Sequence, residues 1–293
     1  MFVPLIVNPI PLDPAFPYTG NRVAKPLIPA RTQGPENMME PMTRTTADGT
    51  AFALLPPQDG GRAATLLLFA TADAASLVTE TYSRIGRLLH ARGWNVVSLD
   101  LPCHGADRRK GEPDQLHGWA ARTAKGEDFV AAFRKRVDAV VDHLVATGIA
   151  DPSRLATTGT SRGGFMAFHA AAGNPRIKAV AAFAPVTDLS ALSEFAGQED
   201  NPLVRRLALV QAVDALADRQ AWIAIGDADE RVRTDKAVAF ANAVTAAGKA
   251  RGLEGGITLR VLPVPGHVSF PEWHDEAAVW FQRLRFVMDT PHR

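Results

Sequence analysis

A serine bordered by glycines lies between a predicted strand and a predicted helix. The turn reads Gly159-Thr160-Ser161-Arg162-Gly163-Gly164, with an apolar stretch (154–158) before it and a helical stretch (165–172) after it. In such a tight turn a serine projects its hydroxyl above the edge of the sheet, and glycines let neighbouring backbone come close. The N–H groups that begin the helix stabilise negative charge at the same point. The pattern predicts that Ser161 is a nucleophile in acyl transfer.

A serine hydroxyl is a poor nucleophile unless a base takes its proton. His267 lies in the sequence Pro265-Gly266-His267, directly after the last predicted strand and before the last predicted helix. This loop falls at the carboxyl end of the sheet, at the same edge as Ser161. His274 is the alternative, but it falls in the first turns of the helix, where we expect it to face solvent. We therefore predict that His267 is the base.

An acid must hold the imidazole of the base in the correct tautomer. The loop 226–232 follows a predicted strand and contains Asp227 and Asp229. Either carboxylate could be an ordinary solvated loop charge, and only the chain order Ser, Asp, His favours a catalytic role. We predict Asp229 as the acid and keep Asp227 as the alternative.

The elements that position these residues alternate along the chain from about residue 50. Short apolar stretches alternate with amphipathic ones, which is typical of a parallel sheet with crossover helices. The apolar stretches predict strands at 65–70, 95–99, 154–158, 178–183, 221–225 and 257–262. Helical spacing covers 76–92, 126–147, 162–173, 234–249 and 272–288. Residues 50–55 predict a further, antiparallel edge strand.

The chain divides into an arm and one catalytic domain. Residues 1–41 contain nine prolines without a helical or alternating period, so we predict an extended arm over residues 1–45. The α/β catalytic domain is predicted over 46–293. The segment 187–218 lies between two strands and breaks the alternation, so it is the predicted position of a small cap.

The charge and hydrophobicity of the chain limit the kinds of partner that it can bind. Lys and Arg (32) nearly balance Asp and Glu (31), which disfavours nucleic acid and anionic surfaces as partners. An apolar run of roughly 18 residues, the minimum for a membrane span, is absent, and the apolar N-terminus lacks the basic start of a signal peptide. We therefore expect a cytoplasmic protein with a small-molecule substrate. The histidines show no pair at metal-ligand spacing, and the predicted chemistry needs no cofactor.

The motifs together resemble the α/β-hydrolase superfamily, and more narrowly its prolyl oligopeptidase and dienelactone hydrolase-like branches. The resemblance rests on G-T-S-R-G-G at 159–164, on Gly226, Asp229 and Val232 as G-x-x-D-x-x-V, and on P-G-H at 265–267. The stretch 100–105 is similar to the D-x-x-x-H-G sequence of these proteins, and the resemblance covers about residues 48–290. It implies the α/β-hydrolase fold, with a mostly parallel central sheet and helices on both faces.

Two features differ from the family pattern. The loop after the first core strand reads Phe69-Ala70-Thr71-Ala72-Asp73 and not H-G-G-G, so we expect the oxyanion donors to be the backbone N–H of Arg162 and that of Thr71 or Ala72. The chain also has no room for the β-propeller that screens peptides in prolyl oligopeptidases. This second difference favours an esterase over a peptidase.

The expected function is that of a serine hydrolase, a carboxylesterase that cleaves small esters through a Ser-His-Asp triad and an acyl-enzyme intermediate. An acyl-peptide or small-peptide hydrolase with the same triad is the first alternative. A hydrolase-fold protein that binds a ligand without turnover is the second. Binding alone does not need an ordered Ser, Asp and His, so this second alternative is the weaker one.

Overall fold

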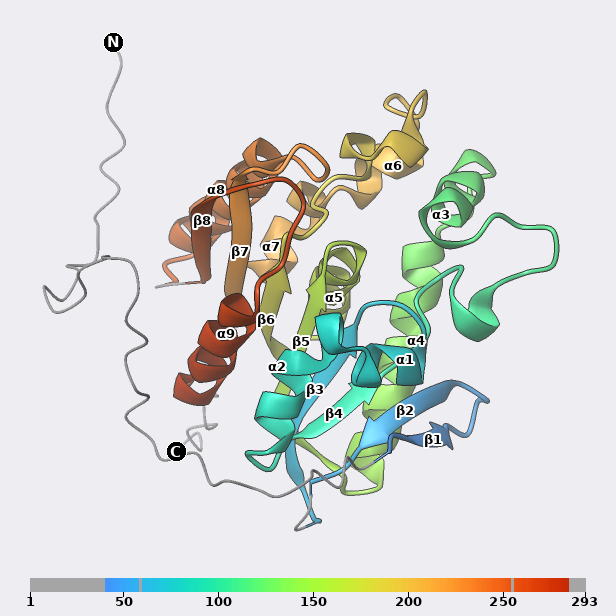
Figure 1. Ribbon diagram of the computed structural model, residues 1–293, viewed down its shortest axis with the longest axis vertical. Helices are drawn as coiled ribbons and strands as arrows, with labels where there is room; N and C mark the ends of the chain where they lie inside the picture. Colours follow the sequence, from blue (N-terminus) through green and yellow to red (C-terminus); the bar gives the residue numbers. More distant parts are fainter. Residues whose placement is uncertain (1–39, 58–59, 254–255, 285–293) are drawn as a thin grey trace, which may run out of the picture. The chain divides into compact units, whose positions relative to one another are not determined.

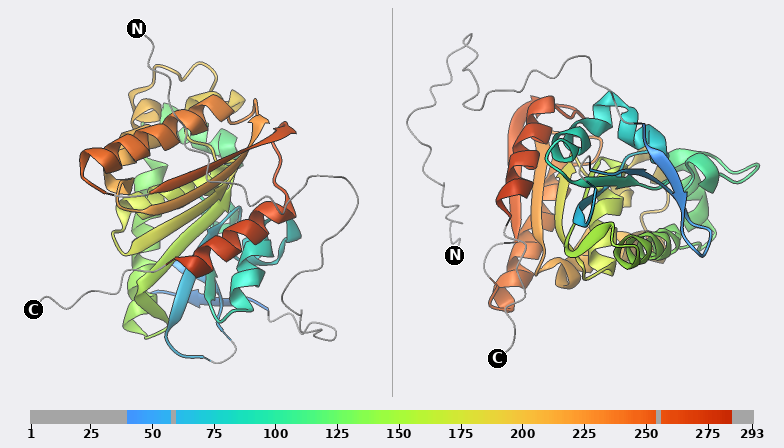
Figure 2. Two further views of the ribbon diagram at one scale, coloured as in Figure 1. Left: turned by 90° about the vertical axis from the view of Figure 1, so that its left-hand side faces the viewer. Right: turned by 90° about the horizontal axis from the view of Figure 1, so that it is seen from below.

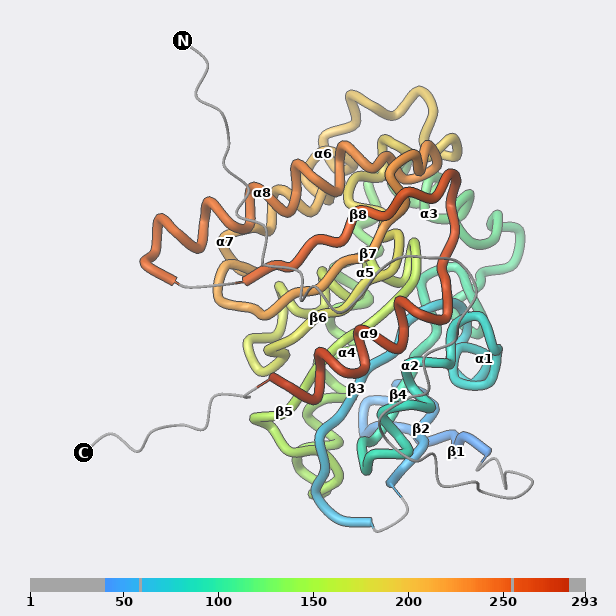
Figure 3. Tube along the Cα trace, turned by 60° about the vertical axis from the view of Figure 1, so that its left-hand side comes forward, coloured from blue at the N-terminus to red at the C-terminus, as the bar shows by residue number. Residues whose placement is uncertain are grey.

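An eight-stranded sheet runs through the part of the chain that the computed structural model describes, residues 40–57, 60–253 and 256–284. In spatial order its strands are β1 (Met42–Thr45), β2 (Ala51–Leu55), β4 (Asn95–Ser98), β3 (Ala63–Phe69), β5 (Ala150–Thr160), β6 (Ile177–Phe183), β7 (Gln220–Ala228) and β8 (Ile257–Pro265). β2 pairs antiparallel with β1 and with β4, and all the other pairs are parallel. β1 and β8 form the two opposite edges (Figure 3).

Helices cover both faces of this sheet (Figure 1). One face carries α1 (Asp73–Val78), α2 (Glu80–His90) and α9 (Pro271–Arg283). The other carries α4 (Phe129–Ala146), α5 (Arg162–Gly173) and α8 (Thr234–Ala250). The two views in Figure 2 show these layers on either side of the strands. The predicted class, a mostly parallel sheet between two helical layers, is confirmed.

The side chains of each strand point alternately to the two faces of the sheet, so one sheet contributes to two hydrophobic clusters. In β3, Leu67 and Phe69 point into the cluster under α4 and α5, while Leu66 and Leu68 point into the cluster under α1, α2 and α9. Alternate residues of a strand face opposite sides, and here both sides are buried. A strand covered on both faces therefore has the nearly continuous apolar sequence from which it was predicted.

Several predicted boundaries differ from the structure. Residues 42–45, which were predicted to belong to the arm, form β1. β2 was predicted to be the edge strand, but it lies between β1 and β4. Residues 1–39 of the predicted arm lie outside the described residues. The predicted helix 76–92 is two helices, because Thr79 between them has an extended backbone. The predicted helix 272–288 begins at Pro271, and α9 ends at Arg283, near the end of the described chain.

One helix was not predicted. α3 (Gln115–Ala124) follows the loop after β4, and its Leu116, Trp119 and Ala120 have helical spacing and join the core. Its Arg122 is buried and forms ion pairs of 2.6 Å with Asp107 and 2.7 Å with Glu112. These charge-assisted contacts add to the apolar packing that holds α3 against the loop.

The segment 187–218 joins β6 to β7. It consists of short helices and 3-10 turns, namely Leu189–Ala191, Ser193–Phe195, α6 (Pro202–Leu207), Leu209–Ala212 and α7 (Val213–Leu216). Its buried side chains, among them Leu189, Phe195 and Val204, join the core on the α5 face of the sheet. The segment is thus an ordered insertion between two core strands, and its action as a cap stays a prediction.

Candidate active site

The carboxyl ends of the parallel strands meet at one edge of the sheet, and the predicted site residues lie there. The loop after β3 carries Thr71 and Ala72, the turn after β5 carries Ser161, and the loops after β7 and β8 carry Asp229 and His267. β4 and β5 lie on opposite sides of β3, so the chain changes direction across the sheet at this point. Ligands in open α/β sheets bind at such switch points.

Ser161 has the strained backbone that the turn requires. Its φ is 54° and its ψ is −116°, a conformation that a non-glycine residue rarely adopts. Its N–H donates to the Phe183 carbonyl (2.9 Å), and its own carbonyl accepts from the Val186 N–H (3.1 Å). These bonds to the end of β6 and the loop after it hold the turn between β5 and α5.

Glycine is needed beside the serine for a steric reason. A Cβ on Gly159 or on Gly163 would overlap the carbonyl oxygen of Phe69, at the end of β3. The start of α5 therefore lies against the neighbouring strand with no space for a side chain. This close approach places the first N–H groups of α5 beside the loop that follows β3.

The imidazole of His267 connects the serine to the acid. Its Nε2 lies 2.9 Å from Ser161 Oγ, and its Nδ1 lies 2.8 Å from Asp229 Oδ2. A carboxylate can only accept hydrogen bonds, so Nδ1 carries the proton and Nε2 is free to accept from the serine hydroxyl. The structure thus brings together the three side chains predicted as nucleophile, base and acid.

Asp229 is held by its own loop. Its side chain is fully buried, and its Oδ1 accepts from the backbone N–H of Arg231 (3.0 Å) and of Val232 (3.2 Å). The Asp229 N–H donates in turn to Thr234 Oγ1 (3.1 Å). With Oδ1 satisfied by the backbone, Oδ2 is directed at the imidazole.

The two alternative site residues lie elsewhere. Asp227 is exposed to solvent. His274 is buried, contrary to the expectation that it faces solvent: its ring stacks on Phe183 with centroids 3.9 Å apart, and its Nε2 lies 3.0 Å from Ser269 Oγ. The reason is that α9 packs on the sheet with this face inward. Burial lowers the pKa of His274 to about 4, so it is neutral at physiological pH.

The structure separates the two candidates for the second oxyanion donor. The Thr71 N–H donates to Ser76 Oγ at 3.0 Å, so it is already used. The Ala72 N–H has no acceptor within the described residues, and Arg162 is the first residue of α5, where an N–H has no partner inside the helix. Arg162 and Ala72 therefore carry the N–H groups that remain available.

His104 and Cys103 lie in the loop after β4 and belong to the fold. His104 is buried and its Nδ1 lies 2.8 Å from the Pro102 carbonyl oxygen, so it orders the loop. Cys103 is buried in the core. Burial raises the pKa of the Cys103 thiol to about 12. A thiol held in this neutral form is inert as a nucleophile.

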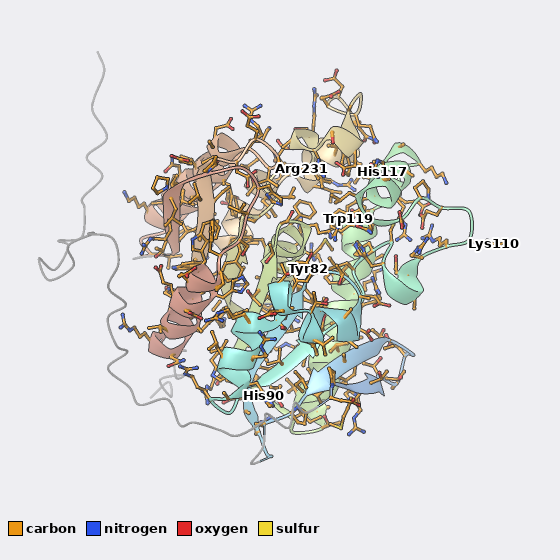
Figure 4. The ribbon with its side chains drawn as sticks, viewed as in Figure 1. Tyr82, His90, Lys110, His117, Trp119 and Arg231 are labelled. Carbon is orange, nitrogen blue, oxygen red and sulfur yellow. The ribbon has the colours of Figure 1, made fainter. Side chains whose placement is uncertain are left out.

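Sequence reasoning missed several polar residues around this edge of the sheet. Figure 4 shows Tyr82 on α2, His117 on α3 and Arg231 on the loop after β7. Arg231 donates to Glu194 Oε1 (2.6 Å) in the segment 187–218. The sequence could have indicated Arg231, because it lies two residues after Asp229. Nothing in the sequences of α2 and α3 indicated that Tyr82 or His117 lies near the site.

The described part of the chain offers neither a metal site nor a membrane-spanning helix. Among its residues, no three His, Cys, Asp or Glu side chains gather closely enough to hold a metal ion. None of the helices in the same ranges has the length and apolar character needed to cross a bilayer.

The model of the prolyl oligopeptidase family (Peptidase_S9) matches residues 123–284, more than half of the chain. The matched region contains the serine turn after β5, the acid loop after β7 and the histidine loop after β8. No curated protein sequence matches the chain.

Solved structures of the α/β-hydrolase fold are similar to it. A puromycin-hydrolyzing peptidase of Mycobacterium tuberculosis superposes with a TM-score of 0.61 at 15% identity over 83% of this chain and 40% of the peptidase. An acylaminoacyl peptidase of Pyrococcus horikoshii gives 0.61 at 12% identity over 83% of this chain and 41% of that one. An acetyl xylan esterase from Paenibacillus sp. R4 gives 0.57 at 16% identity over 85% and 86% of the two chains. The α/β-hydrolase fold is thereby confirmed.

The lengths of these matches differ. The chain spans about two fifths of each of the two peptidases, and nearly the whole of the esterase.

Proposed function

The chain belongs to the prolyl oligopeptidase family and is a serine hydrolase, and from this premise we propose that it is a carboxylesterase acting on small esters. The observation that carries the proposal is the chain of contacts from Ser161 through His267 to Asp229. In the proposed mechanism Ser161 is the nucleophile, His267 the general acid and base, and Asp229 the residue that orients the imidazole.

The first half of the reaction forms an acyl-enzyme. Ser161 Oγ attacks the ester carbonyl carbon while its proton passes to His267 Nε2. The tetrahedral intermediate then collapses, the bond from carbon to the alcohol oxygen breaks, and the alcohol leaves with the proton from His267. Asp229 accepts a hydrogen bond from the imidazolium throughout and so stabilises its charge.

The second half releases the acid. A water molecule gives its proton to His267 Nε2 and attacks the acyl carbon, and the intermediate collapses with return of the proton to Ser161 Oγ. All these steps use groups of the chain itself and no cofactor.

Negative charge on the former carbonyl oxygen needs donors that are fixed in advance. We assign this role to the backbone N–H of Arg162 and of Ala72. The close packing of Gly163 on Phe69 supports the assignment, because it brings the start of α5 beside the loop after β3. The use of the Thr71 N–H by Ser76 supports Ala72 over Thr71.

A small-peptide or acyl-peptide hydrolase is the second candidate. It is favoured by the family and by the likeness to two peptidase structures. An ester requires only the nucleophile, the base and the oxyanion donors, and the described residues offer all three. An efficient peptidase must also bind the peptide on both sides of the scissile bond, and we assign no residue to that task.

The experiment is a panel of p-nitrophenyl esters and aminoacyl anilides assayed side by side with the same protein, using Ser161→Ala as the blank. We expect kcat/KM for acetyl and butyryl esters to exceed that for every anilide. Anilide turnover of equal or greater efficiency would favour the peptide hydrolase. Turnover of esters that survives in the blank would contradict both candidates.

A further inference from the structure

The side chain of Arg162 bridges two elements beside the nucleophile. Its Nε donates to the Ala70 carbonyl (3.2 Å), two residues before the proposed oxyanion donor Ala72, and one terminal nitrogen donates to Gln115 Oε1 (2.9 Å) at the start of α3. Since Arg162 directly follows Ser161, its guanidinium lies at the edge of the sheet where the substrate must enter. Tyr82 of α2 also lies near it.

Two other charged side chains at this edge, those of Arg231 and Asp229, are already paired. Arg231 binds Glu194 at 2.6 Å, and a terminal nitrogen of the same arginine donates to Ser193 Oγ (3.1 Å). Asp229 faces His267. Arg162 has no carboxylate partner among the described residues: its acceptors are the Ala70 carbonyl and the Gln115 amide oxygen. The Arg162 guanidinium therefore forms no ion pair within the described part of the chain.

This charge lies in a partly dehydrated place. Burial lowers the pKa of Arg162, nearby Arg231 lowers it further, and Tyr82 and Glu194 offset this only in part. A guanidinium removed from water without a counter-ion gains free energy when an anion arrives. Its planar fork of N–H groups matches a carboxylate in particular, because both oxygens can accept at once.

We propose that the Arg162 guanidinium binds a carboxylate carried by the substrate, so that the preferred substrates are half-esters of short dicarboxylic acids or similar anionic esters. The inference rests on the proposed function, since it names the substrate class of the same site. Arg162 then acts twice: its backbone N–H faces the oxyanion, and its side chain holds the carboxylate and so aligns the ester carbonyl with Ser161 Oγ.

The test compares two esters of equal acyl length. 4-Nitrophenyl glutarate ends in a free carboxylate and 4-nitrophenyl pentanoate ends in a methyl group; spontaneous hydrolysis is subtracted with Ser161→Ala. We expect wild-type kcat/KM to be higher for the glutarate, and the ratio of the two kcat/KM values to fall roughly 10- to 100-fold in Arg162→Gln, the range for loss of a charged hydrogen bond. Arg162 belongs to the site, so its substitution can lower the turnover of both esters. The ratio of the two kcat/KM values isolates the effect on the carboxylate.

Two further variants test the carboxylate site even if Arg162→Gln does not fold. Gln115→Glu puts a carboxylate beside the guanidinium, which neutralises it in place, so the ratio should fall here too. Arg92→Gln removes a charge from an exposed arginine before the amino end of β4, far along the chain from the site residues, and should leave the ratio unchanged.

The failures are distinguishable. If pentanoate is hydrolysed and a fluorophosphonate labels Ser161, but the wild type does not prefer glutarate and Gln115→Glu keeps the wild-type ratio, the carboxylate site is wrong and the proposed esterase stands. If neither ester is hydrolysed and Ser161 is not labelled, the proposed function fails and the inference fails with it.

Discussion

His267 Nδ1 lies 2.8 Å from Oδ2 of Asp229, whose side chain is fully buried. The second oxygen of this carboxylate is occupied by the N–H groups of Arg231 and Val232. The acid is therefore fixed on both sides, by its own loop and by the imidazole. Such a contact sets the tautomer of the histidine, and its loss lowers kcat.

The first prediction separates the two acids of the loop. Asp229→Asn should lower kcat by orders of magnitude, about 10⁴-fold in a comparable triad, because an amide can donate to Nδ1 and favours the wrong tautomer. Asp227→Asn is the matched control, since this side chain is exposed two residues away, and it should stay within about threefold of the wild type. The assay is hydrolysis of p-nitrophenyl butyrate. A larger loss in Asp227→Asn would move the acid to that residue.

Local sequence was enough to predict which three side chains the structure brings into contact. Ser161, Asp229 and His267 each follow a strand that is apolar because both its faces are buried, so the strand predicts the edge at which the residue falls. Their mutual distances needed the structure, but their order along the chain did not.

Contacts between distant segments could not be predicted. His274 was expected to face solvent. Its ring instead stacks on Phe183 of β6, which lies ninety-one residues earlier in the sequence. The hydrogen bond from Arg162 to Gln115 depends on the position of α3, which is held by apolar contacts with the core and by the ion pairs of Arg122. The choice between Thr71 and Ala72 depended on the position of the Ser76 hydroxyl, which the sequence does not reveal.

The second prediction concerns the packing of the serine turn. Gly163→Ala should destabilise the protein by about 3 kcal/mol or more, because its Cβ would overlap the backbone carbonyl of Phe69. Gly86→Ala on α2 is the control: its Cβ would lie 3.1 Å from a methyl of Val96 and 3.2 Å from one of Leu68, and methyl groups can shift. We expect about 1 kcal/mol there. Urea unfolding measures both, and equal losses would contradict the proposed close contact.

The third prediction concerns stability and pH. Burial lowers the pKa of His274 and of His169 from 6.5 to about 4. Between these values the unfolded chain binds protons that the folded chain does not, so stability is complete above about pH 6.5 and is lost as the pH falls toward 4. From about pH 7 to about pH 5.5, each histidine should remove about 1 kcal/mol from the free energy of unfolding.

The comparison variant for this effect is His274→Gln, whose amide can replace Nε2 in the contact with Ser269. Urea unfolding at the two pH values should show a loss about 1 kcal/mol smaller in the variant than in the wild type. An identical loss in both proteins would mean that His274 takes up a proton in the folded state as easily as in the unfolded chain.

The fourth prediction concerns the segment 187–218. Arg231, two residues after Asp229, binds Glu194 of this segment, and Lys236 binds Asp188 at 2.6 Å. These ion pairs tie the segment to the acid loop and to α8, which supports its proposed action as a cap that narrows the entrance. We expect kcat/KM to peak at acetyl to butyryl esters and to fall with longer acyl chains.

A long open pocket would give the opposite trend, since each buried methylene could contribute about 0.8 kcal/mol. The measurement is a series of neutral p-nitrophenyl esters from acetyl to dodecanoyl. A maximum at eight carbons or beyond would show that the segment does not close the site to long chains.

The most direct test of the proposed mechanism is Ser161→Ala, assayed for ester hydrolysis and for covalent labelling by a fluorophosphonate. The turn accepts alanine because only the hydroxyl is removed, so thermal unfolding should resemble that of the wild type. We predict that labelling disappears and that kcat falls by at least about 10⁴-fold, as expected when a triad loses its nucleophile. A folded Ser161→Ala protein that keeps wild-type turnover of p-nitrophenyl esters would contradict the assignment of Ser161 as the nucleophile.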